Sequence, residues 1–411
     1  MSVLTQASLV LTPNAVKASK LYSIIPSNGN GDMTVVRATT ATRVNSSGLI
    51  ESVAANVPRL NYDGSCPSIL VEPQRTNLVL RSEDFSNVIW QKLNSSNISL
   101  NTNYTNPSGS ISTYKYTASN LAFGGILRQA LTITSATTYT FSFFCKKDNY
   151  RYIGIRFNTS VNNERFPNYD FDTDTLNTQG VVGAILSREL FSNGWVKLVL
   201  TYTSTTTAGT TDIGITSANG STAIGLTGTE SVYIWGPQLE LGSYPTSYIP
   251  TVATSVTRNT DSITRNNIYT NGLITSTGGT WFIELNNNIP YIRDNASATS
   301  IQTSSVSALN GFVIKTSGGG SNRCFIGKKL SNVESVLYVT LTNTVKIAID
   351  WNGTTADVFV NGVKVVTATS FPATIMEFFT ADAIDVPKYI KSMMLFPKPL
   401  TDAECIALTT L

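Results

Sequence analysis

Apolar and polar residues alternate with a period of two along most of the chain, which is the pattern of half-buried β-strands. In residues 139–143 the aromatic side chains fall on one face and the hydroxyls on the other. Residues 195–202 and 345–351 show the same alternation. The pattern therefore predicts an all-β fold.

Two local signals are stronger than the alternation. Asn361-Gly362 separates two short apolar segments, and this dipeptide tolerates the two positive φ angles of a type I′ hairpin turn. Near the C-terminus, Thr401 and Glu404 fit a capping box, and Pro397 and Pro399 come just before it. We expect one short helix there and no other clear one.

The chain has 411 residues, which is too long for one compact core. Residues 1–75 read as irregular, apart from a hairpin around 45–48, and residues 76–250 carry strand patterns at sandwich-like spacing. A polar linker over 251–274 precedes a second sandwich over 275–411. The predicted fold is a tandem β-sandwich of jelly-roll type with an N-terminal attachment segment.

Charged residues make up 13% of the chain, about half of the usual share of roughly 25%. The net charge is +3, and Lys and Arg form no cluster, so we expect no nucleic-acid partner. No run of 18 apolar residues exists, so we expect no membrane span. Residues 1–20 lack the basic and apolar regions of a secretion signal.

The sequence contains no histidine, which excludes Ser-His-Asp, Cys-His and histidine–metal chemistry. Cys66, Cys145, Cys324 and Cys405 form no C-x-x-C pair and lie far apart in the sequence. They are expected to be buried free thiols rather than disulfide or zinc ligands. We therefore predict a protein that is not an enzyme and needs no cofactor.

Asp170, Asp172 and Asp174 are the most conspicuous group of acidic residues. Alternate carboxylates on a strand face one way, and such a group suits Ca²⁺. Two carboxylates at a suitable separation also suit glycoside hydrolysis. The third alternative is a solvated turn after a strand, since Asp favours turns.

Aromatic side chains on loops can stack on the apolar face of a sugar ring. Tyr150, Tyr152 and Tyr291 lie near predicted loops and are the candidate glycan-binding residues. Trp195 and Trp351 lie in strand patterns and are expected to pack in cores.

Several stretches resemble a block that is common in bacteriophage fibre and spike proteins. The block consists of Asn56-Val57-Pro58-Arg59-Leu60, residues 66–78 with the run Glu72-Pro73-Gln74-Arg75-Thr76-Asn77-Leu78, residues 82–87 and Trp90. Trp235-Gly236-Pro237-Gln238-Leu239-Glu240 and residues 244–251 resemble its usual end. Between them the chain looks like a carbohydrate-binding jelly roll. Residues 275–411 resemble a concanavalin A-like, laminin-G-type lectin domain, through the Val-Phe-Val-Asn-Gly hairpin and the closing helix.

The resemblance implies a virion protein, usually a homotrimer, that attaches to other virion proteins through its N-terminal part. Related carbohydrate modules often hold a structural Ca²⁺ where Glu83 and Asp84 stand. Their last strand supplies a further acid, and residues 233–238 offer no Asp, so the chain departs from the pattern.

Our first hypothesis is a bacteriophage fibre or spike, on head or tail, that binds host-surface or environmental glycans and is made in the cytoplasm of the infected bacterium. The rival is a polysaccharide depolymerase that uses only Asp and Glu. A bacterial surface adhesin is disfavoured by the missing secretion signal and cell-wall anchor.

The N-terminal segment also indicates assembly. It carries apolar residues and few signs of a core of its own. These residues are Leu9, Val10, Leu11, Leu21, Tyr22, Ile24 and Ile25. Burying them against copies of the chain or against a virion protein predicts a homotrimer. The alternative is a monomer in which the segment folds back on the first sandwich.

Overall fold

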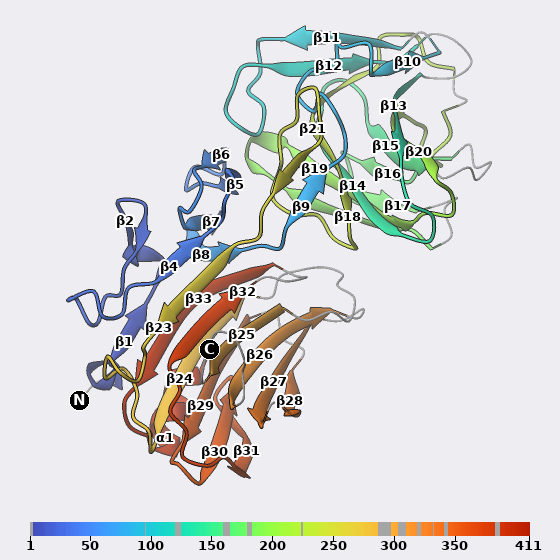
Figure 1. The fold of residues 1–411 in the computed structure, drawn as a ribbon. Coiled ribbons are helices and arrows are strands. Elements are labelled where there is room, and N and C mark those ends of the chain that lie inside the picture. The colour runs from blue at the N-terminus through green and yellow to red at the C-terminus, as the bar shows by residue number, and fades with distance from the viewer. Residues whose placement is uncertain are drawn as a thin grey trace. The chain divides into compact units, whose positions relative to one another are not determined.

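The computed structural model shows a chain built from two compact units (Figure 1). It describes residues 3–94, 96–119, 125–158, 165–178, 183–222, 225–286, 297–302, 310–318, 322–331, 333–340, 344–382 and 387–411. The central unit comprises residues 47–51 and 75–258, and the split unit comprises residues 1–46, 52–74 and 259–411. The described parts contain one α-helix among many strands, which confirms the all-β class. None of their helices is long and apolar enough to cross a membrane.

The central unit consists of two six-stranded antiparallel sheets packed face to face. Sheet A has the order β10-β13-β20-β15-β16-β17, and sheet B has the order β11-β12-β21-β14-β19-β18. The strands of sheet A are β10 (Gln91–Leu93), β13 (Ile126–Thr132), β15 (Tyr152–Asn158), β16 (Asn168–Asp170), β17 (Thr175–Asn177) and β20 (Ala208–Ile215). Those of sheet B are β11 (Asn97–Asn101), β12 (Thr113–Thr117), β14 (Thr138–Lys147), β18 (Ile185–Leu190), β19 (Val196–Thr203) and β21 (Ser231–Leu241). A separate pair joins β9 (Arg75–Asn77) to β22 (Val256–Arg258).

The core of the central unit follows the predicted alternation. Tyr139, Phe141 and Phe143 on β14 point between the sheets and are buried, as are Leu198 and Leu200 on β19. A second apolar cluster covers the outer face of sheet B. It contains Ile50, Phe144, Trp195, Tyr233, Trp235 and Tyr248. The prediction that Trp195 packs in a core is confirmed.

The split unit is a second sandwich. Sheet C has the order β31-β30-β29-β24-β33-β8-β7, with β1 also paired to β33, and sheet D has the order β28-β27-β26-β25-β32-β23-β4. The strands of sheet C are β1 (Leu9–Leu11), β7 (Arg59–Asp63), β8 (Cys66–Val71), β24 (Gly279–Asn286), β29 (Thr344–Trp351), β30 (Thr355–Val360), β31 (Val363–Ser370) and β33 (Lys388–Phe396). Those of sheet D are β4 (Thr34–Val36), β23 (Ser262–Asn266), β25 (Ser297–Gln302), β26 (Gly311–Gly318), β27 (Asn322–Leu330), β28 (Val333–Thr340) and β32 (Phe378–Asp382). Short pairs β2 (Val16–Lys17) with β3 (Lys20–Leu21) and β5 (Ala41–Val44) with β6 (Ile50–Val53) complete the strands.

The N-terminal segment differs from its predicted organisation, because most of it belongs to the split unit. It supplies β1, β7 and β8 to sheet C and β4 to sheet D. Leu9, Leu11 and Leu21 are buried in the same core as the C-terminal strands. The segment thus covers its apolar side chains within the chain, so they do not require another copy to bury them. Ile24 and Ile25 stay exposed, at 48% and 37%.

The linker predicted over 251–274 also differs, because β22 and β23 lie within it and belong to different units. The segment is polar in sequence because β23 buries Ile263 among mainly polar neighbours. The hairpin predicted around 45–48 is present as β5 and β6.

The two strong local signals are confirmed. Asn361 and Gly362 have φ angles of 47° and 82° between β30 and β31. The helix α1 (Asp402–Thr409) begins with a capping box made by Thr401 and Glu404. Cys405 on this helix packs with apolar side chains on the outer face of sheet C.

A buried ion network contains Arg59 and Glu72, two residues of the sequence block that resembles fibre and spike proteins. Arg59 Nη1 donates to Glu72 Oε2 at 2.7 Å, and Arg59 Nη2 donates to Asp261. Arg37 Nη1 donates to the other oxygen of Asp261 at 2.8 Å. All four side chains are at most 3% exposed. Two cations balance two anions, so this part of the block holds three segments of the split unit together.

Other residues of the block form hydrogen bonds within the central unit. Asn77 Nδ2 donates to the carbonyls of Pro237 and Ile249, at 3.2 and 2.8 Å. Gln238 Oε1 accepts from the amide of Ile249 at 2.6 Å. Arg75 Nη2 donates to Tyr244 Oη at 2.7 Å. The two ends of the block therefore bind each other and close the sandwich.

The cysteines are free thiols, and three of them, Cys145, Cys324 and Cys405, are buried as expected. Burial raises the pKa of the Cys324 thiol to about 12. Cys66 differs from the expectation, because it lies exposed beside the turn between β7 and β8.

Candidate functional site

Of the predicted stacking residues, Tyr152 begins β15 and Tyr150 lies two residues before it, with ring centroids 6.3 Å apart. Tyr150 Oη donates to the carbonyl of Thr216, and the ring is partly buried against the core. Tyr152 alternates with the buried Ile153, so it lies on the outer face of sheet A, with the Arg151 guanidinium 5.1 Å from its ring centroid. Tyr291 lies outside the described residues.

The Asp-Phe-Asp-Thr-Asp segment forms a turn, one of the three alternatives considered above. Asp170 ends β16, and residues 171–174 form the turn before β17. Each carboxylate has a cationic partner: Asp170 pairs with Arg151, Asp172 with Lys147 and, at 3.6 Å, with Arg151, and Asp174 with Arg188. The segment is therefore neutralised locally.

The hydrogen bonds of this turn favour ionised carboxylates. Arg151 donates to both oxygens of Asp170 at 2.7 Å, and this holds the pKa of Asp170 well below its usual range. The Tyr169 hydroxyl donates to Asp174 at 2.7 Å and, together with Arg188, lowers its pKa. Neither carboxyl is suited to act as a proton donor at neutral pH.

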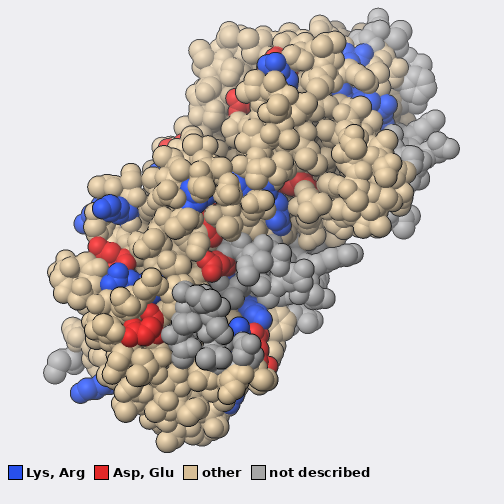
Figure 2. All heavy atoms as spheres, viewed as in Figure 1, with Lys and Arg blue, Asp and Glu red and all other residues tan. Residues whose placement is uncertain are grey.

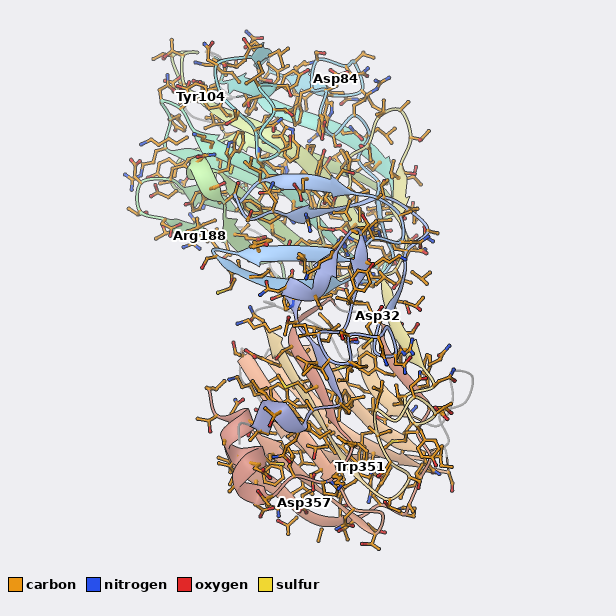
Figure 3. The ribbon with its side chains drawn as sticks, turned by 90° about the vertical axis from the view of Figure 1, so that its left-hand side faces the viewer. Asp32, Asp84, Tyr104, Arg188, Trp351 and Asp357 are labelled. Atoms are coloured by element: carbon orange, nitrogen blue, oxygen red, sulfur yellow. The ribbon has the colours of Figure 1, made fainter. Side chains whose placement is uncertain are left out.

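Glu83 and Asp84 lie in a different part of the central unit. Desolvation raises the pKa of the Glu83 carboxyl, although the hydrogen bond with the Tyr248 hydroxyl acts in the opposite direction. Asp84 accepts from Ser86 at 2.5 Å, and this hydrogen bond lowers its pKa. Figure 3 shows Asp84 well apart from Arg188, the partner of Asp174. The two predicted calcium positions are therefore separate.

No group of three or more Cys, Asp and Glu side chains in the described ranges is arranged to hold a metal ion. Calcium at Glu83 and Asp84, or at the turn, stays a prediction.

The outer face of sheet A carries a row of charged residues that the sequence analysis did not single out. Arg128, Asp212 and Arg156 are direct neighbours on β13, β20 and β15. Leu127 and Ile213, which adjoin them along the strands, are buried in the core. By alternation the three charged side chains point away from the core.

The row has a defined geometry. Arg128 donates to the two oxygens of Asp212 through Nε at 2.7 Å and Nη2 at 2.8 Å. Arg156 donates through Nε at 3.0 Å and Nη2 at 2.7 Å, both to Asp212 Oδ2. The Asp212 side chain is fully buried, whereas those of Arg128 and Arg156 are 23% and 13% exposed. The hydrogen bonds that Arg128 donates to Asp212 raise the pKa of Arg128.

Phe166 packs over the sheet beside this row. Its ring centroid lies 4.2 Å from the Arg156 guanidinium carbon. Gly154 makes room for it, because a Cβ there would lie 2.6 Å from the Phe166 Cβ. Gly214 lies under the edge of the same ring. The glycines on β15 and β20 thus leave space for the Phe166 ring, and this ring packs against Arg156.

A second aromatic that the sequence analysis missed is Tyr104, which is 43% exposed (Figure 3). Its ring centroid lies 4.8 Å from that of Tyr233 and 5.6 Å from the Lys146 ammonium. The sequence signal for this position was weak, because Tyr104 lies in a polar loop with no strand pattern. The signal for the charged row was the presence of Arg128, Arg156 and Asp212 inside apolar strand patterns.

The face of the molecule drawn in Figure 2 carries few charges. The visible face shows scattered Lys, Arg, Asp and Glu among mostly uncharged residues.

No family model matches the chain, and no curated protein matches it by sequence. Among solved structures it is similar to the CBM40 of a Ruminococcus gnavus IT-sialidase bound to α2,3-sialyllactose, with 15% identity, a TM-score of 0.25, and coverage of 32% of this chain and 83% of that one. It is also similar to domain 4 of AbnA, a GH43 extracellular arabinanase from Geobacillus stearothermophilus, in complex with arabinotriose, with 14% identity, a TM-score of 0.29, and coverage of 41% and 86%.

A third similar structure is the CBM22-1–CBM22-2 tandem of Paenibacillus barcinonensis Xyn10C, with 9% identity, a TM-score of 0.24, and coverage of 75% of this chain and 93% of that one.

Proposed function

We propose that this chain is a non-enzymatic fibre or spike protein of a bacteriophage virion, on head or tail, and that its central unit binds host-surface or environmental glycans. The observation that carries the glycan proposal is the outer face of sheet A. Planar charged groups at Arg128, Asp212 and Arg156 share this face with the aromatic ring of Tyr152. Sugars are bound by such combinations of hydrogen-bonding groups and an aromatic surface.

The position of these groups supports binding. They stand on paired strands rather than on loops, and strands hold side chains in fixed positions. Asp212 is fully buried, although a buried carboxylate is costly unless it is paired. Arg128 and Arg156 compensate the buried carboxylate, and Asp212 in turn fixes the orientation of both guanidinium groups.

The virion part of the proposal is supported by the phage-like block and by the low share of charged residues, 13%. Within the block, Arg59, Glu72 and Asn77 take part in buried polar networks. The free thiols fit synthesis in the reducing cytoplasm of an infected bacterium.

Assembly as a homotrimer is also part of the proposal. Its support is the apolar surface that the folded chain leaves exposed. Strand β28 is an edge strand of sheet D, and it exposes Val333, Val336 and Val339, at 66%, 58% and 37%. Exposed apolar edge strands invite pairing with another chain. With Ile24 and Ile25, these valines are the apolar surface that further copies or virion proteins would cover.

A glycan array probed with the full-length chain tests the binding. We expect signals from a restricted set of glycans, and a Tyr152→Ala variant is expected to weaken them because it removes the aromatic surface. A Tyr62→Ala variant is the matched control, since it removes a partly exposed tyrosine from the split unit. An array on which the wild-type chain binds no glycan would remove the binding proposal.

Two further measurements test the absence of enzymatic activity and the trimeric state. Incubation with bacterial capsular polysaccharide is expected to release no reducing ends, and their release would replace the proposal with a depolymerase. Light scattering is expected to give three times the mass of the 44.3 kDa chain, and the mass of one chain at micromolar concentration would end the trimer proposal.

A further inference from the structure

The outer face of sheet B carries a second aromatic surface, on the opposite side of the sandwich from Tyr152. Lys115, Tyr233 and Lys146 stand side by side on β12, β21 and β14. Each has a strand neighbour in the core between the sheets, so by alternation these three side chains point outward. The row covers two spacings between strands, which is about 10 Å.

Tyr104 lies over this row. Its ring centroid is 4.8 Å from that of Tyr233 and 5.6 Å from the Lys146 ammonium. Both of these residues belong to the sheet, so the two contacts come from the sheet side of the Tyr104 ring. Tyr104 is still 43% exposed, whereas Tyr233 is 3% exposed (Figure 3). The side of the Tyr104 ring that faces away from the sheet is therefore open to solvent.

Hydrogen bonds hold the loop that carries this ring. Thr113 Oγ1 donates to the carbonyl of Tyr104 at 3.0 Å. Trp195 Nε1 donates to the carbonyl of Thr105 at 3.0 Å, and Trp195 belongs to the apolar cluster on the outer face of sheet B. A ring on such a support is already ordered, so a ligand that stacks on it loses little free energy in immobilising it.

Hydrogen-bonding groups stand beside the ring. The Tyr233 hydroxyl donates to Asp148 Oδ1 at 3.3 Å, and Ser231 Oγ donates to Asp148 Oδ2 at 2.6 Å. Lys115 Nζ lies 2.7 Å from the same Oδ2. Burial works against ionisation of Asp148, but the hydrogen bonds from Lys115 and Ser231 outweigh it and lower the pKa of the carboxyl. The side chains of Asp148 and Lys115 are 21% and 33% exposed, so a ligand can reach both.

We propose that Tyr104, Asp148 and Lys115 form a second glycan-binding site, for a neutral oligosaccharide of hexopyranose units. This inference rests on the proposed glycan binding and adds a site and a ligand class to it. The C–H face of one hexose would stack on the open side of the Tyr104 ring. Its hydroxyl groups, or those of the next unit along the row, would donate to the carboxylate and accept from the ammonium.

The charges around the ring favour a neutral ligand. Asp148 and Lys115 carry opposite charges and pair with each other, so together they offer an acceptor and a donor without a net charge. The Lys146 ammonium donates to the Asn193 carbonyl at 2.5 Å and lies on the sheet side of the Tyr104 ring. Uncharged hydroxyl groups suit this arrangement, because they both donate and accept.

Calorimetry with the full-length chain tests the site, using maltotriose, cellotriose, mannotriose and galactotriose. We expect at least one of these trisaccharides to bind. Tyr104→Leu keeps an apolar cover over Tyr233 but removes the flat ring, and is expected to weaken binding about tenfold or more. Tyr104→Phe keeps the ring and should retain most of the affinity. Asp148→Asn keeps the shape without the charge, and should weaken binding about fivefold.

Two controls accompany these variants. Tyr62→Ala removes a partly exposed tyrosine from the split unit and should bind like the wild type. Thermal unfolding shows whether each variant is folded. On the glycan array, Tyr104→Leu and Tyr152→Ala are expected to weaken different sets of glycans, because the two residues lie on opposite faces of the sandwich.

The outcomes separate the second site from the proposed function. Full affinity in Tyr104→Leu, or no binding of any of the four trisaccharides, would overturn the second site and leave binding at sheet A intact. An equal loss in Tyr104→Phe and Tyr104→Leu would overturn the stacking role, and loss of the same glycans in Tyr104→Leu and Tyr152→Ala would overturn the separation of the sites. An array on which the wild-type chain binds no glycan would overturn the proposed binding function as well.

Discussion

Replacing Arg59 by methionine should strongly destabilise the split unit. Arg59 is fully buried, and its guanidinium donates to the Thr42 carbonyl at 2.9 Å, to Glu72 at 2.7 Å, and to Asp261. The variant leaves two buried carboxylates and only Arg37 to balance them. Breaking a buried ion pair in this way costs about 3–5 kcal/mol, against a typical domain stability of about 5–15 kcal/mol.

The assay must separate the two units. Urea titrations followed by hydrogen exchange report on β24 and β29 in the split unit and on β14 and β19 in the central unit. Protection in the split unit should be lost at a much lower urea concentration, while the central unit serves as an internal reference. A Lys17→Met variant, which removes an exposed cation from the split unit, should change stability by less than about 0.5 kcal/mol.

A double-mutant cycle tests the cause. Glu72→Leu in the Arg59→Met background removes the stranded carboxylate, so the double variant should be less destabilised than the sum of the two single variants. The expected coupling is about 1–3 kcal/mol. A loss below about 1 kcal/mol in Arg59→Met, or strict additivity in the cycle, would refute the argument that the network is electrostatically coupled.

Other predictions concern single positions. Burial raises the pKa of Asp350 to about 6. Between about pH 4 and 6 the folded state therefore holds a proton that the unfolded state has lost. The contribution of Asp350 to the free energy of unfolding falls as the pH rises through that window. Asp350→Asn should remove this fall, gaining on the order of 1 kcal/mol at pH 7.5 relative to pH 4.5 in urea titrations. A thiol reagent should label only Cys66 in the native chain and the other cysteines after unfolding; labelling of more than one native thiol would contradict the buried positions. Thr401→Ala should cost about 0.5–2 kcal/mol by removing the capping box, measured by thermal unfolding. Gly154→Ala should displace Phe166 and weaken glycan binding measured by calorimetry, and unchanged affinity would show that Phe166 does not support the site.

Short-range features were predictable from the sequence. The hairpin at Asn361-Gly362 and the helix after Thr401 depend on backbone angles and caps that a few neighbouring residues determine. The all-β class followed from alternation, because a period of two is a property of each strand by itself. The core positions of Phe141 and Trp351 followed in the same way.

Only the tertiary structure decided which segments share a core and which charges meet. Leu9 and Ile263 pack with the C-terminal strands, and no local pattern reports a partner hundreds of residues away. Arg128, Arg156 and Asp212 come together through strand order and register, which depend on pairing across the whole sheet. A sequence shows that a charge lies in a strand, whereas the neighbour that makes it part of a site is fixed by long-range packing.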